Sequence, residues 1–207
     1  MVGGFDIQKD CEKLARTGNV HPGQVYQTHA GGLYYKQLFH AVIPVLDMSQ
    51  QDQCEKLLLS ALWTALHEAD VQKYSTLAMP PIGNGRFRFP MEEIAKHIIR
   101  RIKKYLQTKT ETHLRKIIMC DIDNPSTSFL NEFSENGALK ERGNFSITLF
   151  DRQKPGVHAR ICSLFIRFIF IVIDNLTKQM YGLTMQPHSI NTCHFVKLYI
   201  NIILKIF

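Results

Sequence analysis

The chain has 207 residues, of which 45% are hydrophobic and 21% are charged, and this composition excludes a chain that is disordered throughout. Its formal net charge of +7 favours anionic partners, but a solvated basic surface explains the same charge, so the charge identifies no ligand. Five scattered cysteines without metal-ligand spacing, and a start that lacks the apolar region of a signal peptide, exclude a disulfide framework and favour a reducing compartment.

The first part of the chain predicts a helix, two strands and a longer helix. Apolar residues at helical spacing predict a short surface helix over residues 6–16. Residues 24–28 alternate like a strand, and residues 38–44 form an apolar run typical of a strand buried on both faces. His40 lies inside this run without acidic or nucleophilic neighbours in sequence, which favours a hydrogen-bonded core residue over a catalyst. An apolar stripe over residues 51–70 predicts an amphipathic helix.

The next part alternates strands and helices. Residues 74–79 predict a buried strand, and Pro90 begins a helix whose isoleucines recur every four residues opposite a basic face. That face could bind nucleic acid or an anionic membrane, although a solvated outer face explains it more simply. Residues 114–120 predict another strand, and residues 126–133 a further helix. This alternation predicts an α/β domain with helices on both faces of the sheet and ligands at the carboxyl ends of its strands.

A glycine-containing loop joins the strand that ends at Met79 to the helix that begins at Pro90. Gly83 and Gly85 lack a Cβ, so their backbone can take positive φ angles and approach a ligand closely. Backbone amides arranged in this way hold phosphate groups. A Gly-x-Gly sequence between a strand and a helix is, however, more often a plain tight turn. The loop alone therefore leaves both interpretations open.

Taken together, four segments resemble the macro domain, the module that binds ADP-ribose. They occur in the expected order and are Gly23-Gln24-Val25 through Ala30-Gly31-Gly32-Leu33, Lys36 through His40-Ala41-Val42-Ile43-Pro44, Ala78 through Ile82-Gly83-Asn84-Gly85-Arg86-Phe87 to Pro90, and Lys116 through Asp121. The opening residues 3–8 further resemble the first macro domain of the B-aggressive-lymphoma group of poly(ADP-ribose) polymerases. The resemblance implies a three-layer α/β/α sandwich.

The resemblance also implies a set of ligand-binding residues. Backbone amides of the glycine loop would hold the diphosphate, an aromatic ring would lie beside the distal ribose, and the end of the last strand would lie near the adenine. These positions are Ile82, Gly83, Asn84, Gly85, Arg86, Phe87, Asp121 and Ile122. The resemblance implies no cofactor and no metal, with ADP-ribose or ADP-ribosylated proteins as partners in the nucleus and cytoplasm.

Departures from the family pattern lower the expected affinity. A complete macro domain begins with further strands and a helix that supply an acidic residue for adenine, an asparagine near the ribose and a first glycine-rich loop. We expect this chain to be incomplete at its N-terminus and to lack these groups. Ile43 also stands where the family usually has glycine before a proline. We therefore expect weak binding of ADP-ribose unless another segment completes the sheet.

The expected domain division is a partial macro domain over residues 1–140, a polar linker over 141–156 and an apolar tail over 157–207. The linker contains one strand-like run, residues 145–150. Charged residues interrupt and end the first apolar run of the tail, which argues against a membrane span. We expect the tail to be an aberrant terminus that covers an exposed sheet edge or promotes aggregation.

The family resemblance and the apolar tail together leave three classes of function. The leading one is a binding module without catalytic residues, from a protein of the macro-domain poly(ADP-ribose) polymerase group. A second is an ADP-ribosyl hydrolase of the same family, which would need the asparagine and water-positioning groups that we expect to be absent. A third is a non-binding or membrane-associated fragment, for which the apolar tail is the discriminating feature. No direct nucleic-acid site and no transferase pocket are expected.

Overall fold

A computed structural model of the chain describes residues 5–33, 35–84, 87–120, 145–150 and 198–204. Periodic apolar residues form three α-helices among these residues, and the β-branched runs form strands. The helices are α1 (Phe5–Arg16), α2 (Gln51–Val71, preceded by the 3-10 turn Met48–Gln50) and α3 (Met91–Thr108). The strands are β1 (Val25–Thr28), β2 (Gln37–Ile43), β3 (Thr76–Met79), β4 (Lys116–Cys120), β5 (Ser146–Phe150) and β6 (Leu198–Leu204).

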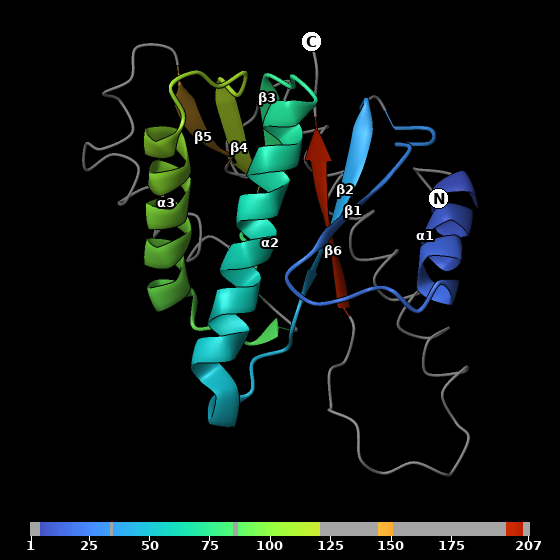
Figure 1. The fold of residues 1–207 in the computed structure, drawn as a ribbon, viewed down its shortest axis with the longest axis horizontal. Coiled ribbons are helices and arrows are strands. Elements are labelled where there is room, and N and C mark those ends of the chain that lie inside the picture. Colours follow the sequence, from blue (N-terminus) through green and yellow to red (C-terminus); the bar gives the residue numbers. More distant parts are fainter. Residues whose placement is uncertain (1–4, 34, 85–86, 121–144, 151–197, 205–207) are drawn as a thin grey trace.

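The strands form one mixed sheet in the order β1-β2-β6-β3-β4-β5 (Figure 1). β3, β4 and β5 are parallel to one another. β1 pairs antiparallel with β2, and β6 pairs antiparallel with both β2 and β3. Since β6 runs opposite to both neighbours, β2 and β3 run in the same direction. The carboxyl ends of β2, β3 and β4 therefore lie at one edge of the sheet.

Helices cover both faces of this sheet. Phe39, Ala41 and Ile43 of β2 are fully buried in the core that includes α2 and α3, whereas His40, between them in sequence, contacts Cys11 of α1. Successive side chains of a strand point to opposite faces, so α1 covers the face opposite to α2 and α3. The predicted α/β/α sandwich and the doubly buried strand are confirmed.

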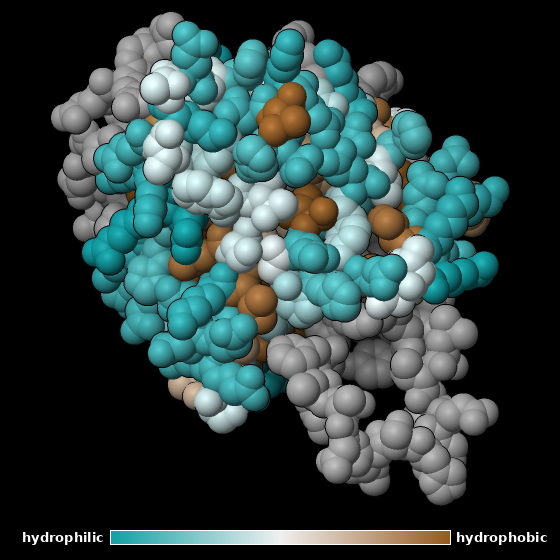
Figure 2. Space-filling view, viewed as in Figure 1, coloured by the Kyte–Doolittle hydropathy of each residue, from teal (hydrophilic) through white to brown (hydrophobic). Residues whose placement is uncertain are grey.

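The basic helix α3 packs as its sequence predicts. Its periodic apolar residues, Ile94, Ile98, Ile102 and Leu106, are buried, and Figure 2 shows that the outer surface over α2 and α3 is mostly hydrophilic. The Cζ atom of Arg101 lies 5.8 Å from the centre of the Trp63 ring, a cation–π contact that spans the two helices. No helix among the described residues is long and apolar enough to cross a membrane.

Two strands come from segments that were expected to lie outside the domain. Five residues of the expected linker form β5, which pairs in parallel with β4. Seven residues of the expected tail form β6, which lies in the middle of the sheet between β2 and β3. This segment of the expected tail is a central strand that pairs with the facing edges of β2 and β3 and so covers both of them. The helix expected over 126–133 lies outside the described residues.

Candidate functional site

The glycine loop leaves the carboxyl end of β3 and folds back on itself before α3. Ile82 is fully buried and fixes the start of the loop in the core. The Asn84 amide donates a long hydrogen bond to the Pro81 carbonyl, at 3.4 Å, and the Phe89 amide donates one to the Gly83 carbonyl, at 3.2 Å. These bonds bring the two ends of the loop, at Gly83 and Phe89, together beside α3.

Gly83 is the residue that this loop conformation requires. Its φ angle is +97°, in the left-handed region that favours glycine. A Cβ at this position would lie 2.9 Å from Cδ1 of Leu58 in α2 and 3.3 Å from Cβ of Phe89. Both the backbone angle and the close packing against α2 therefore exclude a side chain here.

A second hydrogen bond links the glycine loop to the segment that follows β2. The Leu46 amide donates to the Phe87 carbonyl at 2.9 Å. Phe87 is only 3% exposed and belongs to the hydrophobic core, so its ring stabilises the end of the loop. The loops that follow β2 and β3 are thereby joined at the edge where ligands bind in open α/β sheets.

The structure describes four of the eight predicted site residues. Ile82, Gly83, Asn84 and Phe87 lie in the loop, where Asn84 is half-buried. Parallel pairing sets Met79 of β3 beside Met119 of β4, so the chain leaves both strands at the same edge. The remaining four lie outside the described residues, and they are Gly85, Arg86, Asp121 and Ile122. The two parts of the predicted site thus follow neighbouring strand ends.

The start of α3 does not itself favour an anion. Glu92 and Glu93 occupy its first turn and are exposed, and their negative charges complement the positive end of the helix dipole. A phosphate close to these carboxylates would be repelled. Any anion at this edge would therefore depend on the backbone amides of the loop rather than on the helix terminus.

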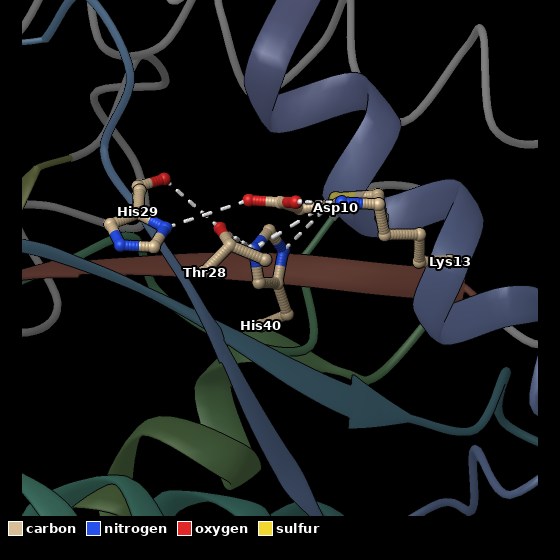
Figure 3. A network of polar contacts seen from close by, with 6 residues as sticks. Asp10, Lys13, Thr28, His29 and His40 are labelled. Carbon is tan, nitrogen blue, oxygen red and sulfur yellow. Dashed lines mark hydrogen bonds and ion pairs between the residues drawn. The ribbon is translucent and has the colours of Figure 1, made fainter.

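Cys11, Thr28 and His40 join α1 to the antiparallel strands, and we call them the neutral cluster because they include no Asp, Glu, Lys or Arg; Figure 3 shows them beside the charged neighbours Asp10 and Lys13. The Thr28 hydroxyl lies 2.8 Å from Nε2 of His40, and Sγ of Cys11 lies 3.9 Å from both ring nitrogens. Burial, followed by the nearby carboxylates of Asp10 and Glu12, raises the pKa of the Cys11 thiol to about 12. A protonated thiol is a poor nucleophile. His40 is fully buried and hydrogen-bonded, as predicted.

A charged polar cluster joins α2, α3 and the segment before β4. Asp70 is buried, and its carboxylate accepts hydrogen bonds from the Tyr105 hydroxyl at 3.0 Å, the Thr112 hydroxyl at 2.9 Å and the His113 amide at 2.6 Å. Burial by itself would raise the pKa of Asp70, but the hydrogen bonds from His113, Thr112 and Tyr105 outweigh it and lower the pKa. These donors stabilise the carboxylate, which fixes the distance between the two helices.

Among the described residues, no group of three or more His, Cys, Asp or Glu side chains is placed to hold a metal ion. The polar side chains within each of the two clusters contact one another and join helices to the sheet. The glycine loop therefore remains the candidate for ligand binding.

Comparison with known proteins identifies the family. A sequence model of the macro domain matches residues 1–99. The human protein mono-ADP-ribosyltransferase PARP14 is 32% identical over 156 residues, which are 74% of this chain and 8% of that protein. Mouse protein mono-ADP-ribosyltransferase PARP9 is 29% identical over 141 residues, which are 65% of this chain and 16% of that protein. The Oceanobacillus iheyensis macrodomain with ADP superposes with a TM-score of 0.58 at 24% identity, covering 65% of this chain and 71% of that chain.

The chain belongs to the macro domain family. It spans a small part of the two mammalian relatives, so their whole-protein activities do not transfer to it. The likeness to the O. iheyensis macrodomain establishes the fold, and that protein was also solved as a variant with ADPR. The resemblance stated from four sequence motifs is therefore confirmed for the family.

The sequence predicted the glycine loop of this macro domain but not the two polar clusters that join its helices to the sheet. The partner of His40 across the sheet, Cys11, is 29 residues away, and Asp70 is 35 to 43 residues from its three partners. No periodicity relates such positions. A buried Asp on the apolar side of α2 was the available signal, because a buried carboxylate requires donors.

Proposed function

We propose that this macro domain binds ADP-ribose, free or attached to proteins, and that the glycine loop holds the diphosphate. The observation that supports the proposal most is Gly83, whose φ of +97° and close packing against Leu58 and Phe89 hold a left-handed turn in the backbone just after β3. A backbone without side chains lets amide groups approach two phosphates closely.

In this proposal, different predicted residues contact the diphosphate, the adenine and the distal ribose of ADP-ribose. Backbone amides over 83–85 bind the diphosphate, and Arg86 adds positive charge beside it. Asp121 and Ile122 supply an acceptor and an apolar surface for adenine. Phe87 lies beside the distal ribose, which its buried ring could contact only through the small part that is exposed. The related macrodomain with ADP supports a nucleoside diphosphate as the ligand class.

The finer parts of the proposal concern affinity and origin. We expect binding weaker than about 1 μM, because Ile43 stands where the family pattern usually has glycine before a proline. The similarity to two mono-ADP-ribosyltransferases supports an origin in the poly(ADP-ribose) polymerase group and, with it, a place in the nucleus and cytoplasm.

Titration calorimetry of the full chain with ADP-ribose tests this function. Gly85→Ala should weaken binding at least about tenfold, equivalent to about 1.4 kcal/mol, because a methyl group keeps the phosphates away from the amides. Gly18→Ala is the control: Gly18 lies outside the loop, in the turn after α1, with a φ of +68° and open space around its Cβ position. Its affinity for ADP-ribose should equal that of the wild type.

Adenosine, which lacks the phosphates, separates the two ends of the ligand. Its binding should be unchanged in Gly85→Ala. Absence of heat with ADP-ribose, or equal losses in Gly85→Ala and Gly18→Ala, would contradict the proposed site. Submicromolar affinity of the wild type would support the function but overturn the expected weakness.

A further inference from the structure

The central strand of the sheet is far from its neighbours in sequence. β6 begins 155 residues after the end of β2 and pairs with all of it, from Gln37 beside Leu204 to Ile43 beside Leu198. On its other side it pairs with β3 at Leu77 and Ala78. Figure 1 shows this strand in red between β2 and β3. We call the position between β2 and β3 the central slot.

The central slot has room for one strand. Neighbouring strands lie about 4.8 Å apart, so β2 and β3 are separated by about two such spacings. Without β6 each of them would present a row of backbone N–H and C=O groups without a strand partner, next to a buried core. Buried backbone groups require hydrogen-bond partners, so the slot favours occupation by an extended segment.

The register on both edges specifies the sequence of the occupant. Three core residues of β2, Phe39, Ala41 and Ile43, are fully buried, and the positions beside them are Ile202, Ile200 and Leu198. On β3, the core residue Leu77 stands beside Leu204. Both edges therefore align even-numbered, apolar positions of β6 with buried core residues of β2 and β3.

The one amide residue of β6 also has a matched position. Asn201 stands beside His40, the buried polar residue of β2. A shift of the register by one residue would place Tyr199, Asn201 and Ile203 in the rows of the main core instead. The slot is thus selective for this seven-residue sequence in this register.

Any second copy of the chain carries the same matching sequence. Residues 151–197 connect β5 to β6, and 47 residues can span well over 100 Å when extended. A strand attached through so long a connection has an effective concentration on the order of 1 mM or less. A second copy at high protein concentration, or during refolding, therefore competes for the slot with the strand of the same chain.

We propose that the central slot is a strand-accepting site and that it takes the β6 strand of a second copy of this chain, which produces an exchanged dimer. Each half of this dimer keeps the sheet order of the single chain, because the exchanged strand has the same sequence and direction. The interaction is strand addition in the middle of a sheet rather than at its outer edge.

Two variants of the full chain, each with one cysteine added to the five native ones, detect the exchange. Ala41 and Ile200 stand directly opposite each other, and opposite residues of antiparallel strands have Cα atoms about 4.5–5.5 Å apart, within the span of a disulfide. Ala41→Cys and Ile200→Cys chains are unfolded together, refolded and oxidised. We expect a covalent dimer of twice the 23.9 kDa chain mass, with the 41–200 disulfide identified by peptide mass mapping.

Three controls define the outcome. Wild-type chains treated in the same way report disulfides of the native cysteines, and a mixture of Val42→Cys with Ile200→Cys tests the register, since Val42 stands beside Tyr199 instead. Both should give no 41–200 or 42–200 dimer. The double variant Ala41→Cys/Ile200→Cys in one chain should form the disulfide within the chain, which shows that the substituted sheet assembles.

Any of three results would overturn the proposal. The first is a disulfide within the double variant without a dimer in the mixture of single variants, which would restrict β6 to its own chain. The second is equal dimer formation by the matched and the displaced pair, and the third is no disulfide in the double variant; both would contradict the register on which the exchange depends.

Discussion

The two halves of the sheet are fixed to their helices by opposite kinds of chemistry. In the parallel half, α2, α3 and the segment before β4 are joined by the ionised Asp70 and its three donors. In the antiparallel half, α1 is held on β1 and β2 by the neutral cluster of Cys11, Thr28 and His40. A buried charge stabilises strongly only while every donor is in place, whereas a neutral cluster contributes less and costs less to disturb.

The largest effect should come from removing the charge of the parallel half. Asp70→Asn replaces an acceptor of three hydrogen bonds by an amide whose NH2 group meets donors, so we expect the free energy of unfolding to fall by about 3 kcal/mol. Urea denaturation measures it. Asp52→Asn, an exposed change in the first turn of the same helix, should cost a few tenths of a kcal/mol. If both variants lose a similar amount of unfolding free energy, the buried carboxylate of Asp70 does not stabilise the parallel half.

The second-largest effect should be a difference in stability loss between glycine substitutions in the loops of the two halves. Gly83→Ala imposes a left-handed backbone on alanine and a Cβ contact of 2.9 Å with Leu58, which together should cost about 2 kcal/mol or more. Gly18→Ala in the antiparallel half imposes only the backbone strain, about 1 kcal/mol. Thermal unfolding of both variants gives the difference. If the two changes cost the same, the packing of Gly83 against α2 contributes nothing.

A smaller effect is expected in the neutral cluster. Thr28→Val keeps the shape of the side chain but removes the 2.8 Å contact with His40, which should cost about 1 kcal/mol and speed hydrogen exchange in α1 more than in α3. Thr110→Val at an exposed position is the matched control and should change neither quantity. Faster exchange in α3 than in α1 would contradict the assignment of this cluster to the antiparallel half.

The smallest expected effect is on the pH dependence of stability, in which the two halves should respond at opposite ends of the pH range. The pKa of Asp70 is lowered in the folded protein, so its contribution is present above the unfolded value of 3.8 and is lost as the pH falls below it. The pKa of Cys11 is raised from 9.0 to about 12, so its contribution is complete below pH 9 and is lost as the pH rises toward 12.

Urea midpoints measured across pH check both signs. Asp70→Asn should lose part of the decline in acid, and Cys11→Ala should lose part of the decline in alkali. The reverse assignment, with Cys11→Ala flattening the acid side, would show that the two clusters had been interpreted incorrectly.

Local patterns were sufficient for most elements of these halves. The isoleucine repeat predicts α3, and the apolar run through Phe39 and Ile43 predicts a strand buried on both faces; both are observed. Four family motifs identified the fold and located the glycine loop. These features depend on residues close in sequence, which periodicity and turn chemistry describe.

Features that depend on distant residues could not be predicted in this way. The pairing of Tyr105 with Asp70, and of Cys11 with His40, depends on which helix faces meet. The apolar residues of β6 were recognised, but an apolar run does not state which slot it fills. That slot is defined by β2 and β3, whose edges exist only after the rest of the sheet has formed.

The position of β6 sets the order in which the protein can fold during synthesis. The ribosome adds about 5–20 residues per second, so the 125 residues between Met79 and Leu204 take about 6–25 s to make. At the start of this interval only α1, β1, β2, α2 and β3 have been synthesised, and α3, β4 and β5 follow within it. The middle of the sheet stays open until β6 is complete. Chaperones that bind extended apolar segments would meet the nascent chain in this state, and the last strand to be synthesised would release it from them.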